Sequence, residues 1–541
     1  MASSSSSKPS DERAGGTPGY LPRGGACVSC RRRKMKCDGK RPICSQCDRA
    51  GRAEDCEYTT GQERSTVQIL EENISRLEAR IQELQNPDVA STSVTLHQPY
   101  VQDPPRHIAE ALLAGFFPFS TDLGFFLNIP RFQASMMQGY PIGHPSRPAP
   151  ALIYTIYLWS IRLSHDPTVK AHEAAYLFRA TQDAATVLSS THPQRVLHSI
   201  QAEVLLTTYF FANGRFFEGK YHLANAVATA ISVGMHKIRS VTPQQPQSDN
   251  NTIPPPRNST EEGERIIGAW LILTLDKLWA AALEYTPNFV YSSHAMATQV
   301  DTPWPLEMED FEQGLLPQHV RTANTIQNFL TGVPSPDLGL STWAFESKAA
   351  ILWDRANVFV RKCSGSAVAQ LTLPPLIQEF TNLSALIDNV VATLPSTDPQ
   401  EIVRVEDPAQ ARRLAIGLTI LKMATIVLHG PFAFAGRSES SRQTRTRAAR
   451  SILRTAIALR SRGTGYLSPI IGTAWIEASQ VLFDEITLIR TLRASGTFTN
   501  TDDAAILSLV QHATTAMADF GVNIPLTSFQ VGKIQEGCRT F

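Results

Sequence analysis

The 541-residue sequence lacks the features that mark several large classes of protein. No uninterrupted apolar run approaches eighteen residues, and the stretch 266–275 ends at Asp276 and Lys277, which argues against a membrane-spanning helix. Residues 1–26 are rich in Ser, Gly and Pro and contain no hydrophobic segment of the kind that a signal peptide needs. We therefore expect a disordered N-terminal arm, no secretory signal and no membrane partner.

Motifs of common enzyme classes are also missing. The sequence has no phosphate-binding loop, no Gly-x-Ser-x-Gly elbow and no His-Glu-x-x-His motif, since His172-Glu173 is not followed by a second histidine. The other histidines are scattered, which favours helix-surface or core positions over ligand roles. Cys363 and Cys538 are isolated, which favours buried thiols over a nucleophile. The sequence predicts that the chain is not an enzyme.

Cysteine is scarce outside one window of thirty residues. Dense cysteine indicates a disulfide framework or a metal site. Because no secretory signal is found and two Cys-x-x-Cys units are spaced for tetrahedral thiolate ligation, zinc is favoured. The alternatives are a RING, LIM or ribbon-type interaction finger and a redox cysteine cluster, but those patterns have eight ligands, histidines or a lone Cys-x-x-Cys. Six thiolates can make two zinc ions four-coordinate if two of them bridge both metals. Six of the eight cysteines form the pattern Cys27-x2-Cys30-x6-Cys37-x6-Cys44-x2-Cys47-x8-Cys56.

This spacing resembles the binuclear zinc cluster of the fungal transcription-factor family. The resemblance implies two Zn²⁺ ions, with the first and fourth cysteines, Cys27 and Cys44, bridging them. Because thirty residues bury too little apolar surface to fold alone, the metal would supply folding energy. One ion would take Cys27, Cys30, Cys37 and Cys44, and the other would take Cys27, Cys44, Cys47 and Cys56.

Positive charge is concentrated in this window. The whole chain has 50 Lys and Arg against 49 Asp and Glu, whereas the window 27–56 has nine against four. Six thiolates with two zinc ions add a charge of −2, which leaves about +3 on a very small unit. Residues 31–36 predict a basic first helix suited to a groove lined by phosphates, whereas residues 48–52 of the second half are mixed. The basic run also fits a nuclear-import signal.

The resemblance further implies which basic residues contact DNA. The family's basic pair, three and four residues after the second cysteine, matches Arg33 and Lys34, and we expect these to bind guanine O6 and N7 in the major groove. The family usually has two lysines there, so a phosphate contact stays open for Arg33. The implied half-site is a CGG triplet. Phosphate contacts are expected from Arg31, Arg32, Lys36, Lys40 and Arg41.

A second pattern follows a ten-residue connector, 57–66. Val or Ile at every a position and Leu at every d position favours a parallel two-stranded coiled coil over residues 67–85. Ser65 and Gln68 form a capping box, and Pro87 ends the helix. The alternative is an amphipathic helix that packs on its own chain, but its position after a basic zinc module favours a homodimer. The seam consists of Val67, Leu70, Ile74, Leu77, Ile81 and Leu84.

The remainder predicts a flexible linker, 86–105, and one large all-α domain, 106–541. Periodicity places helices in this domain, whereas residues 242–260 predict a disordered insert and the acidic stretch 307–312 a loop. The expected helices are 151–163, 171–190, 193–211, 215–236, 263–285, 343–362, 376–394, 408–428, 440–460, 470–493 and 504–520.

Two stretches of the helical domain resemble the middle homology domain of fungal transcription factors. These are residues 214–237 and 264–277, the latter followed by Pro287 and by Asp301-Thr-Pro-Trp-Pro. The match extends over roughly residues 110–330. It implies a regulatory domain with transcription machinery or co-regulators as partners, and it suggests a small-molecule effector for which no residues identify a site. Without the zinc cluster, the same stretches would indicate two ordinary buried helices.

Together these patterns predict a mostly α, nuclear, zinc-dependent transcription factor. It would bind double-stranded DNA as a dimer on paired CGG-like half-sites and regulate RNA polymerase II transcription of metabolic or secondary-metabolite genes. The alternative is a zinc-stabilised module that binds protein or RNA through its basic face without sequence-specific DNA readout. Salt-dependent binding with no sequence preference would favour this alternative.

Overall fold

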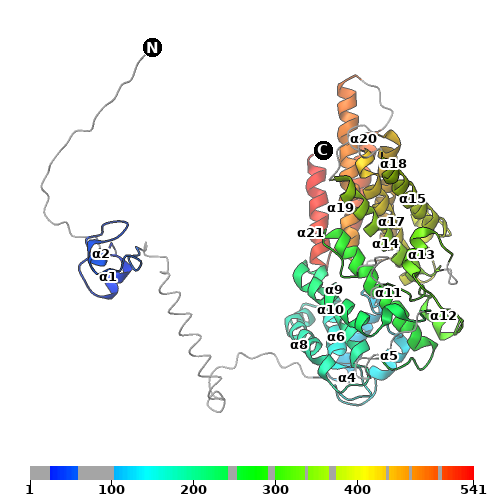
Figure 1. Cartoon of the computed structure of the whole chain (residues 1–541), viewed down its shortest axis with the longest axis horizontal. Helices are drawn as coiled ribbons and strands as arrows, with labels where there is room; N and C mark the ends of the chain where they lie inside the picture. The colour runs from blue at the N-terminus through cyan, green and yellow to red at the C-terminus, as the bar shows by residue number, and fades with distance from the viewer. Residues whose placement is uncertain are drawn as a thin grey trace. The chain divides into compact units, whose positions relative to one another are not determined.

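The structure is a computed structural model of the chain in two compact units, Met1–Gln98 and Pro99–Phe541 (Figure 1). Each unit is described by itself. The predicted coiled-coil residues 67–85 and nearly all of the predicted linker lie outside the described residues, so both stay predictions. The structure describes residues 25–58, 103–241, 253–289, 299–334, 339–364, 373–433, 438–461, 463, 466–496 and 502–541.

The described parts of both units are helical, which confirms the predicted mostly α fold. They contain no β-strand, and one isolated bridge pairs Ser240 with Thr322. The first unit has α1 (Val28–Arg32) and α2 (Ser45–Arg49). The second has α4 (Arg106–Phe116), η2 (Phe117–Phe119), α5 (Ile129–Met136), α6 (Pro150–Leu163), α7 (Pro167–Lys170), α8 (Glu173–Thr186), η3 (Val187–Ser189), α9 (Arg195–Ala212), α10 (Phe216–Ser232), η4 (Met235–Lys237), α11 (Ser259–Ala282), α12 (Met308–Glu312), α13 (Thr325–Thr331), α14 (Thr342–Ser364), α15 (Pro374–Ala392), α16 (Pro399–Ile402), α17 (Pro408–Ala433), α18 (Glu439–Arg460), α19 (Ile470–Ala494), α20 (Asp503–Phe520) and α21 (Pro525–Arg539).

All eleven predicted helices of the second unit are confirmed, and the largest difference lies at the end of α17. Helix α11 begins four residues early because the Asn258 side chain accepts a hydrogen bond from the Glu261 amide at 2.9 Å and caps the helix. Residues 259 and 260, predicted to belong to a disordered insert, are therefore helical. Residues 242–252 of that insert lie outside the described residues.

The sequence analysis missed several short helices and one long one. Helix α12 occupies the acidic stretch predicted as a loop, and that prediction was wrong because Glu307 and Asp310 form a capping box that starts a helix there. Helix α5 is capped by Asn128, whose side chain accepts from the Arg131 amide at 3.1 Å. Apart from α4 and α21, the missed helices have eight residues or fewer, too few for a periodic pattern to stand out. The others are α4, α7, α13, α16 and α21.

Helix α17 lies at the centre of the C-terminal half of the second unit, packed against α14 and α18 (Figure 1). Among the described residues it is the one helix whose length and composition would suffice to cross a membrane, with a mean hydropathy of 1.5 in its most apolar window. In that window 67% of the residues are buried inside the fold. Core packing accounts for this apolar character, as expected of a helix that is covered on most sides.

The stretches that resemble the middle homology domain meet in one junction. The Lys237 Nζ donates to Asp301 Oδ2 at 2.9 Å, and the Asp301 amide donates to the His236 carbonyl at 2.9 Å. The buried Trp270 donates its indole N–H to the Pro303 carbonyl at 2.7 Å. Although burial opposes it, the hydrogen bonds from Ser240 and the Asn324 amide, with the Lys237 ammonium, lower the pKa of Asp301. The motif residues therefore hold the end of α10, η4 and α11 together.

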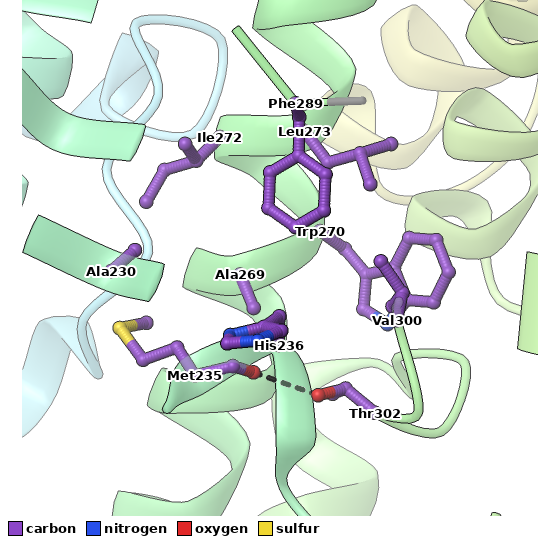
Figure 2. A pocket seen from close by; sticks show the side chains of 10 residues that line it. All are labelled: Ala230, Met235, His236, Ala269, Trp270, Ile272, Leu273, Phe289, Val300 and Thr302. Carbon is purple, nitrogen blue, oxygen red and sulfur yellow. Dashed lines mark hydrogen bonds between the residues drawn. The ribbon is translucent and has the colours of Figure 1, made fainter. Parts of the chain in front are cut away.

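A small cavity lies inside this junction (Figure 2). Its volume is about 10 Å³, and its walls are apolar side chains together with His236 and Thr302. The Thr302 hydroxyl donates to the Met235 carbonyl at 2.7 Å at its edge. A volume near 10 Å³ is about the minimum for one water molecule, so this cavity is a packing defect rather than room for an effector.

Candidate metal centre and nucleic-acid interface

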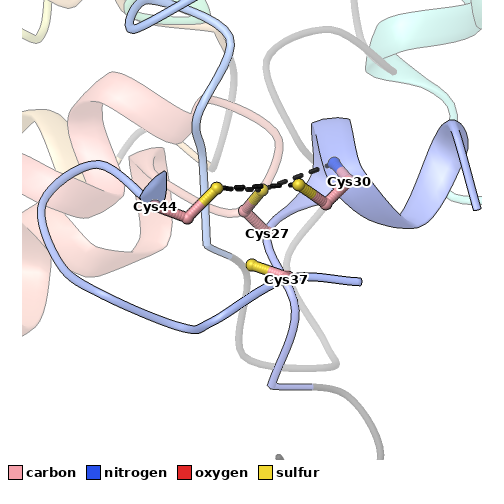
Figure 3. Close-up of side chains that lie close together, drawn as sticks. All are labelled: Cys27, Cys30, Cys37 and Cys44. Atoms are coloured by element: carbon pink, nitrogen blue, oxygen red, sulfur yellow. Dashed lines mark hydrogen bonds between the residues drawn. The ribbon is translucent and has the colours of Figure 1, made fainter. Parts of the chain in front are cut away.

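The first unit brings the six clustered cysteines together. Figure 3 shows four of them, Cys27, Cys30, Cys37 and Cys44. Their Sγ atoms form two groups of four, and within each group all Sγ atoms lie within 4.8 Å of one another. The two groups share Cys27 and Cys44, the pair that the family resemblance assigns to the bridging positions. One group is Cys27, Cys30, Cys37 and Cys44, and the other is Cys27, Cys44, Cys47 and Cys56.

The sulfur–sulfur distances fit thiolate ligation of zinc. Zinc–sulfur bonds of about 2.3 Å in a tetrahedron place two sulfur atoms about 3.8 Å apart. The Cys27 and Cys44 Sγ atoms are 3.7 Å apart, and the Cys30 and Cys44 Sγ atoms are 3.6 Å apart. Disulfide bonds would require about 2.05 Å, and all six cysteines are free thiols. The donor set therefore suits two zinc ions that share two thiolates.

The shared cysteines sit at the starts of the two short helices. Cys27 is the N-cap of α1 and accepts from the Cys30 amide at 3.4 Å, and Cys44 is the N-cap of α2 and accepts from the Cys47 amide at 3.4 Å. Amide donors and the positive end of a helix favour a thiolate over a thiol. Burial opposes ionisation more strongly: it raises the pKa of Cys27 despite its cap, and it raises the pKa of Cys30 to about 12, so metal binding has to displace both protons.

Both helices end in the same way. After α1, the Met35 amide bonds to the Cys30 carbonyl at 2.9 Å and Lys34 takes a left-handed φ of 53°. After α2, the Arg52 amide bonds to the Cys47 carbonyl at 2.9 Å and Gly51 takes a left-handed φ of 66°. Each pattern is a Schellman motif. The basic helix is thus shorter than the predicted basic run, and Lys34 projects from the turn that ends it.

The predicted DNA-contact residues divide into two environments. Arg31, Arg32, Lys34, Lys36, Lys40 and Arg41 are exposed, whereas Arg33 is half-buried. The Arg33 guanidinium donates to the Ser29 hydroxyl at 3.0 Å and lies 3.6 Å from the Cys47 Sγ. It therefore bridges the first helix to a cysteine of the second half. This turns its positive charge toward the sulfur cluster, whereas Lys34 keeps its charge in solvent.

Tyr58 helps to hold the zinc unit together, a role that the sequence analysis did not identify. Its hydroxyl donates to the Lys40 carbonyl at 2.9 Å and lies 3.8 Å from the Cys37 Sγ. The Arg41 guanidinium carbon lies 4.9 Å from the centre of its ring. Tyr58 thus fixes the loop between the two halves, and the stacked Arg41 is held close to the cluster. The only signal in the sequence was one aromatic residue two positions after Cys56, which is too weak to interpret alone.

In the second unit the two remaining cysteines are apart. Cys363 is buried and Cys538 is half-buried, and burial raises the pKa of both thiols. This agrees with the prediction of a buried thiol for Cys363. In the described part of the chain, the two cysteine groups of the first unit are the sets of three or more metal-ligating side chains found close together.

Comparison with known families gives two matches. Residues 25–65 match the fungal Zn(2)-Cys(6) binuclear cluster domain. Residues 123–342 match the fungal specific transcription factor domain, which includes the junction around Lys237 and Asp301. The first match contains all six clustered cysteines and Tyr58. The second match begins in the segment between η2 and α5 and ends at the start of α14.

Three curated relatives are similar to parts of the chain. The notoamide biosynthesis cluster transcriptional coactivator of Aspergillus versicolor is 24% identical over 309 residues, which is 52% of this chain and 58% of the relative. A C6 finger domain transcription factor of Aspergillus fumigatus is 54% identical over 37 residues, 7% of this chain and 5% of the relative. The transcription factor FBD3 of Gibberella moniliformis is 38% identical over 61 residues, 11% and 8% of the two chains. The chain therefore spans little more than half of the first relative and less than a tenth of the others.

Proposed function

This chain belongs to the fungal transcription factors that carry a Zn(2)-Cys(6) binuclear cluster domain and a fungal specific transcription factor domain, and we propose that it reads a specific DNA sequence as a zinc-loaded dimer. The cluster domain binds two zinc ions. The family acts in transcription rather than in catalysis, and we propose that this chain likewise has no enzymatic activity. The observation that carries the proposal is the exposed basic surface built around the six cysteines.

We assign the ligands by the two sulfur groups. Cys27 and Cys44 would be shared by the two ions, Cys30 and Cys37 would complete one site, and Cys47 and Cys56 would complete the other. The zinc ions supply folding energy to a unit of about thirty residues, and they fix the direction in which α1 presents its side chains. The sulfur distances of 3.6 and 3.7 Å support this assignment.

Base reading falls chiefly on Lys34 in this proposal. Its side chain is exposed at the end of α1, where an ammonium can reach guanine O6 and N7 in the major groove. Arg33 supports the cluster instead, because its guanidinium already bonds Ser29 and faces the Cys47 sulfur. The exposed Arg31, Arg32, Lys36, Lys40 and Arg41 hold phosphates and fix the register on the duplex.

We propose a homodimer joined through the heptad seam that starts at Val67 and ends at Leu84. Two copies of the cluster would then meet paired CGG-like half-sites at a spacing set by the connector 57–66. The site of action is the nucleus, with co-regulators or the RNA polymerase II machinery as partners. The similarity to a coactivator named for a biosynthesis cluster favours secondary-metabolite genes over other metabolic genes as targets.

Selection from a random pool of duplex DNA tests the proposal. The full-length chain with zinc, at near-physiological salt, should enrich two CGG-like triplets at one fixed spacing. Enrichment of a single triplet would support sequence-specific DNA binding but would contradict the proposed dimer. No enrichment by the zinc-loaded chain would contradict sequence reading and favour a zinc-stabilised module that binds protein or RNA. The control is the same chain after chelation of zinc, which should enrich nothing.

A further inference from the structure

A cavity of about 270 Å³ lies in the second unit where the first turn of α9 and the start of α11 come together. Its wall consists of residues 193–197, residues 253–255, Arg257, Glu261, Glu264 and Arg265. This volume is close to that of a metabolite site and far larger than the 10 Å³ cavity at His236. Three arginines and two glutamates provide its charge.

The two glutamates already have partners. Arg131, which lies outside the wall, donates to Glu261 at 3.0 Å and lies 3.7 Å from Glu264. Glu261 also accepts from the Arg257 amide at 2.8 Å, and Glu264 accepts from the Asn128 amide at 2.9 Å. Each glutamate therefore already accepts from groups other than Arg195 and Arg265.

Arg195 and Arg265 have no such partners. Neither side chain makes a hydrogen bond or an ion pair with any residue that the structure describes, and the Arg265 Nε is buried without an acceptor. Burial lowers the pKa of Arg265, while the charges of Glu261 and Glu264 oppose that shift. Both side chains are half-buried, and leaving the Arg265 Nε out of water without an acceptor is costly.

The start of α9 adds positive charge to the cavity without an acidic partner. Its N-cap, Gln194, makes no side-chain capping bond, and its first turn contains no acidic residue. The first residue of the helix is instead Arg195, a cation at the positive end of an 18-residue helix. An acceptor with negative charge in the cavity would satisfy both guanidinium groups and would lie at the positive end of α9.

We propose that this cavity binds a small dianion, which Arg195 and Arg265 hold at the start of α9. Phosphate and dicarboxylate groups share this chemistry, since both offer several charged oxygens to guanidinium donors. The proposal goes beyond the DNA-reading function and depends on none of its residues. It gives the helical unit a ligand of defined charge and size.

The test uses the full-length zinc-loaded chain and two probes, inorganic phosphate and succinate, each at constant ionic strength. Titration calorimetry should detect saturable binding of at least one probe, and the same probe should raise the unfolding temperature. Phosphate alone would indicate a phosphorylated ligand, and succinate alone a dicarboxylate. No saturable binding of either probe would overturn the proposal.

Two variants and a matched control locate the site. Arg195→Ala and Arg265→Met should each weaken binding about tenfold or more, because each removes a charge-assisted contact. Arg454→Ala, which removes an exposed arginine of α18, should leave binding unchanged. Unchanged binding in both site variants, or an equal loss in the control, would overturn the proposal.

Folding of the variants has its own readout. Arg265→Met keeps the alkyl stem and removes a desolvated charge, so its unfolding temperature without probe should equal or exceed that of the parent chain. If this variant unfolds, Arg195→Ala decides the question, because the Arg195 side chain lies at a helix start and has no hydrogen bond or ion pair with a described residue to lose. If the chain does not bind either dianion, the result of the DNA selection is unaffected. The two proposals can therefore be contradicted independently of each other.

Discussion

Lys34 and Gly51 occupy equivalent positions in the two halves of the zinc unit, each seven residues after the shared cysteine that caps its helix. Both have a left-handed backbone, with φ of 53° and 66°. Glycine adopts this conformation freely, whereas a residue with a Cβ pays about 1–2 kcal/mol. A lysine held in a glycine conformation points to a role of its side chain that outweighs the backbone strain.

Lys34→Gly separates these two effects. Removing the side chain should cost about 1–3 kcal/mol of DNA binding and blur discrimination at one base. Relieving the backbone should at the same time raise the stability of the zinc unit by about 1 kcal/mol. Selection from random DNA measures the first effect, and competition with a zinc chelator measures the second. Lys34→Ala should lose the same discrimination without the gain in zinc retention.

Gly51→Ala is the matched control for Lys34. The position has open space, since no atom lies within 4 Å of an added Cβ, so the substitution introduces backbone strain and little else. We expect zinc retention to fall by about 1 kcal/mol and base preference to stay unchanged. An altered base preference in Gly51→Ala, or unchanged preference in Lys34→Gly, would contradict the assignment of base reading to Lys34.

Arg33→Ala tests the second role that the structure suggests in α1. The guanidinium bonds Ser29 at 3.0 Å and faces the Cys47 sulfur at 3.6 Å, so its loss should weaken the cluster. Contacts beyond the ligands typically change metal affinity about 10–100-fold. Chelator competition should show a loss of this kind, while the bases selected by the zinc-saturated variant stay the same.

Arg32→Ala is the control for Arg33, because its side chain is exposed. It should leave zinc retention unchanged and weaken DNA binding to all sequences alike, with a shallower salt dependence. If Arg33→Ala changed the selected bases and not the zinc affinity, Arg33 would be a base reader after all.

Leu77→Lys tests the dimer. Leu77 occupies a central d position of the predicted seam, and a charge there should prevent the helices from pairing. Affinity for two half-sites should fall toward that for a single half-site, while zinc content is unchanged. Glu72→Lys at an outward f position is the control and should still bind paired sites. Equal affinity of Leu77→Lys and the parent chain for paired sites would rule out this seam.

The sequence predicted the metal centre well because cysteine chemistry depends on spacing that can be read directly. It could not show that the basic run from Arg31 to Lys36 is interrupted at Lys34, since the end of α1 depends on backbone hydrogen bonds to Cys30. Nor could it separate Arg33 from Lys34, because both are basic residues and their environments differ only after the second half folds against the first.

In the helical unit, long amphipathic helices such as α18 gave a periodic signal, whereas α12 depended on the local Glu307–Asp310 capping box. The cavity at Arg195 and Arg265 was beyond sequence reasoning for another reason. These residues are 70 positions apart and belong to different helices, so their shared lack of partners exists only in the folded chain.

We expect His198 to make the helical unit sensitive to acid. Burial, with a smaller effect of His192, lowers the pKa of His198 to about 3. Its Nδ1 accepts a hydrogen bond from the Ala149 amide at 3.1 Å, which requires the neutral ring at that nitrogen. A depressed pKa contributes stability that is present above the unfolded value near 6.5 and is lost as the pH falls from 6.5 toward 3.

His198→Asn should remove this pH dependence, because the amide oxygen can accept the same hydrogen bond and does not titrate. Between pH 7 and pH 5 the parent chain should lose about 1–2 kcal/mol more free energy of unfolding than the variant. Denaturant unfolding at both pH values measures the difference. His165→Asn, at an exposed histidine, should follow the parent chain. If His198→Asn lost as much stability as the parent, the acid sensitivity would have to come from another buried group, because a neutral side chain at position 198 takes up no proton when the chain unfolds.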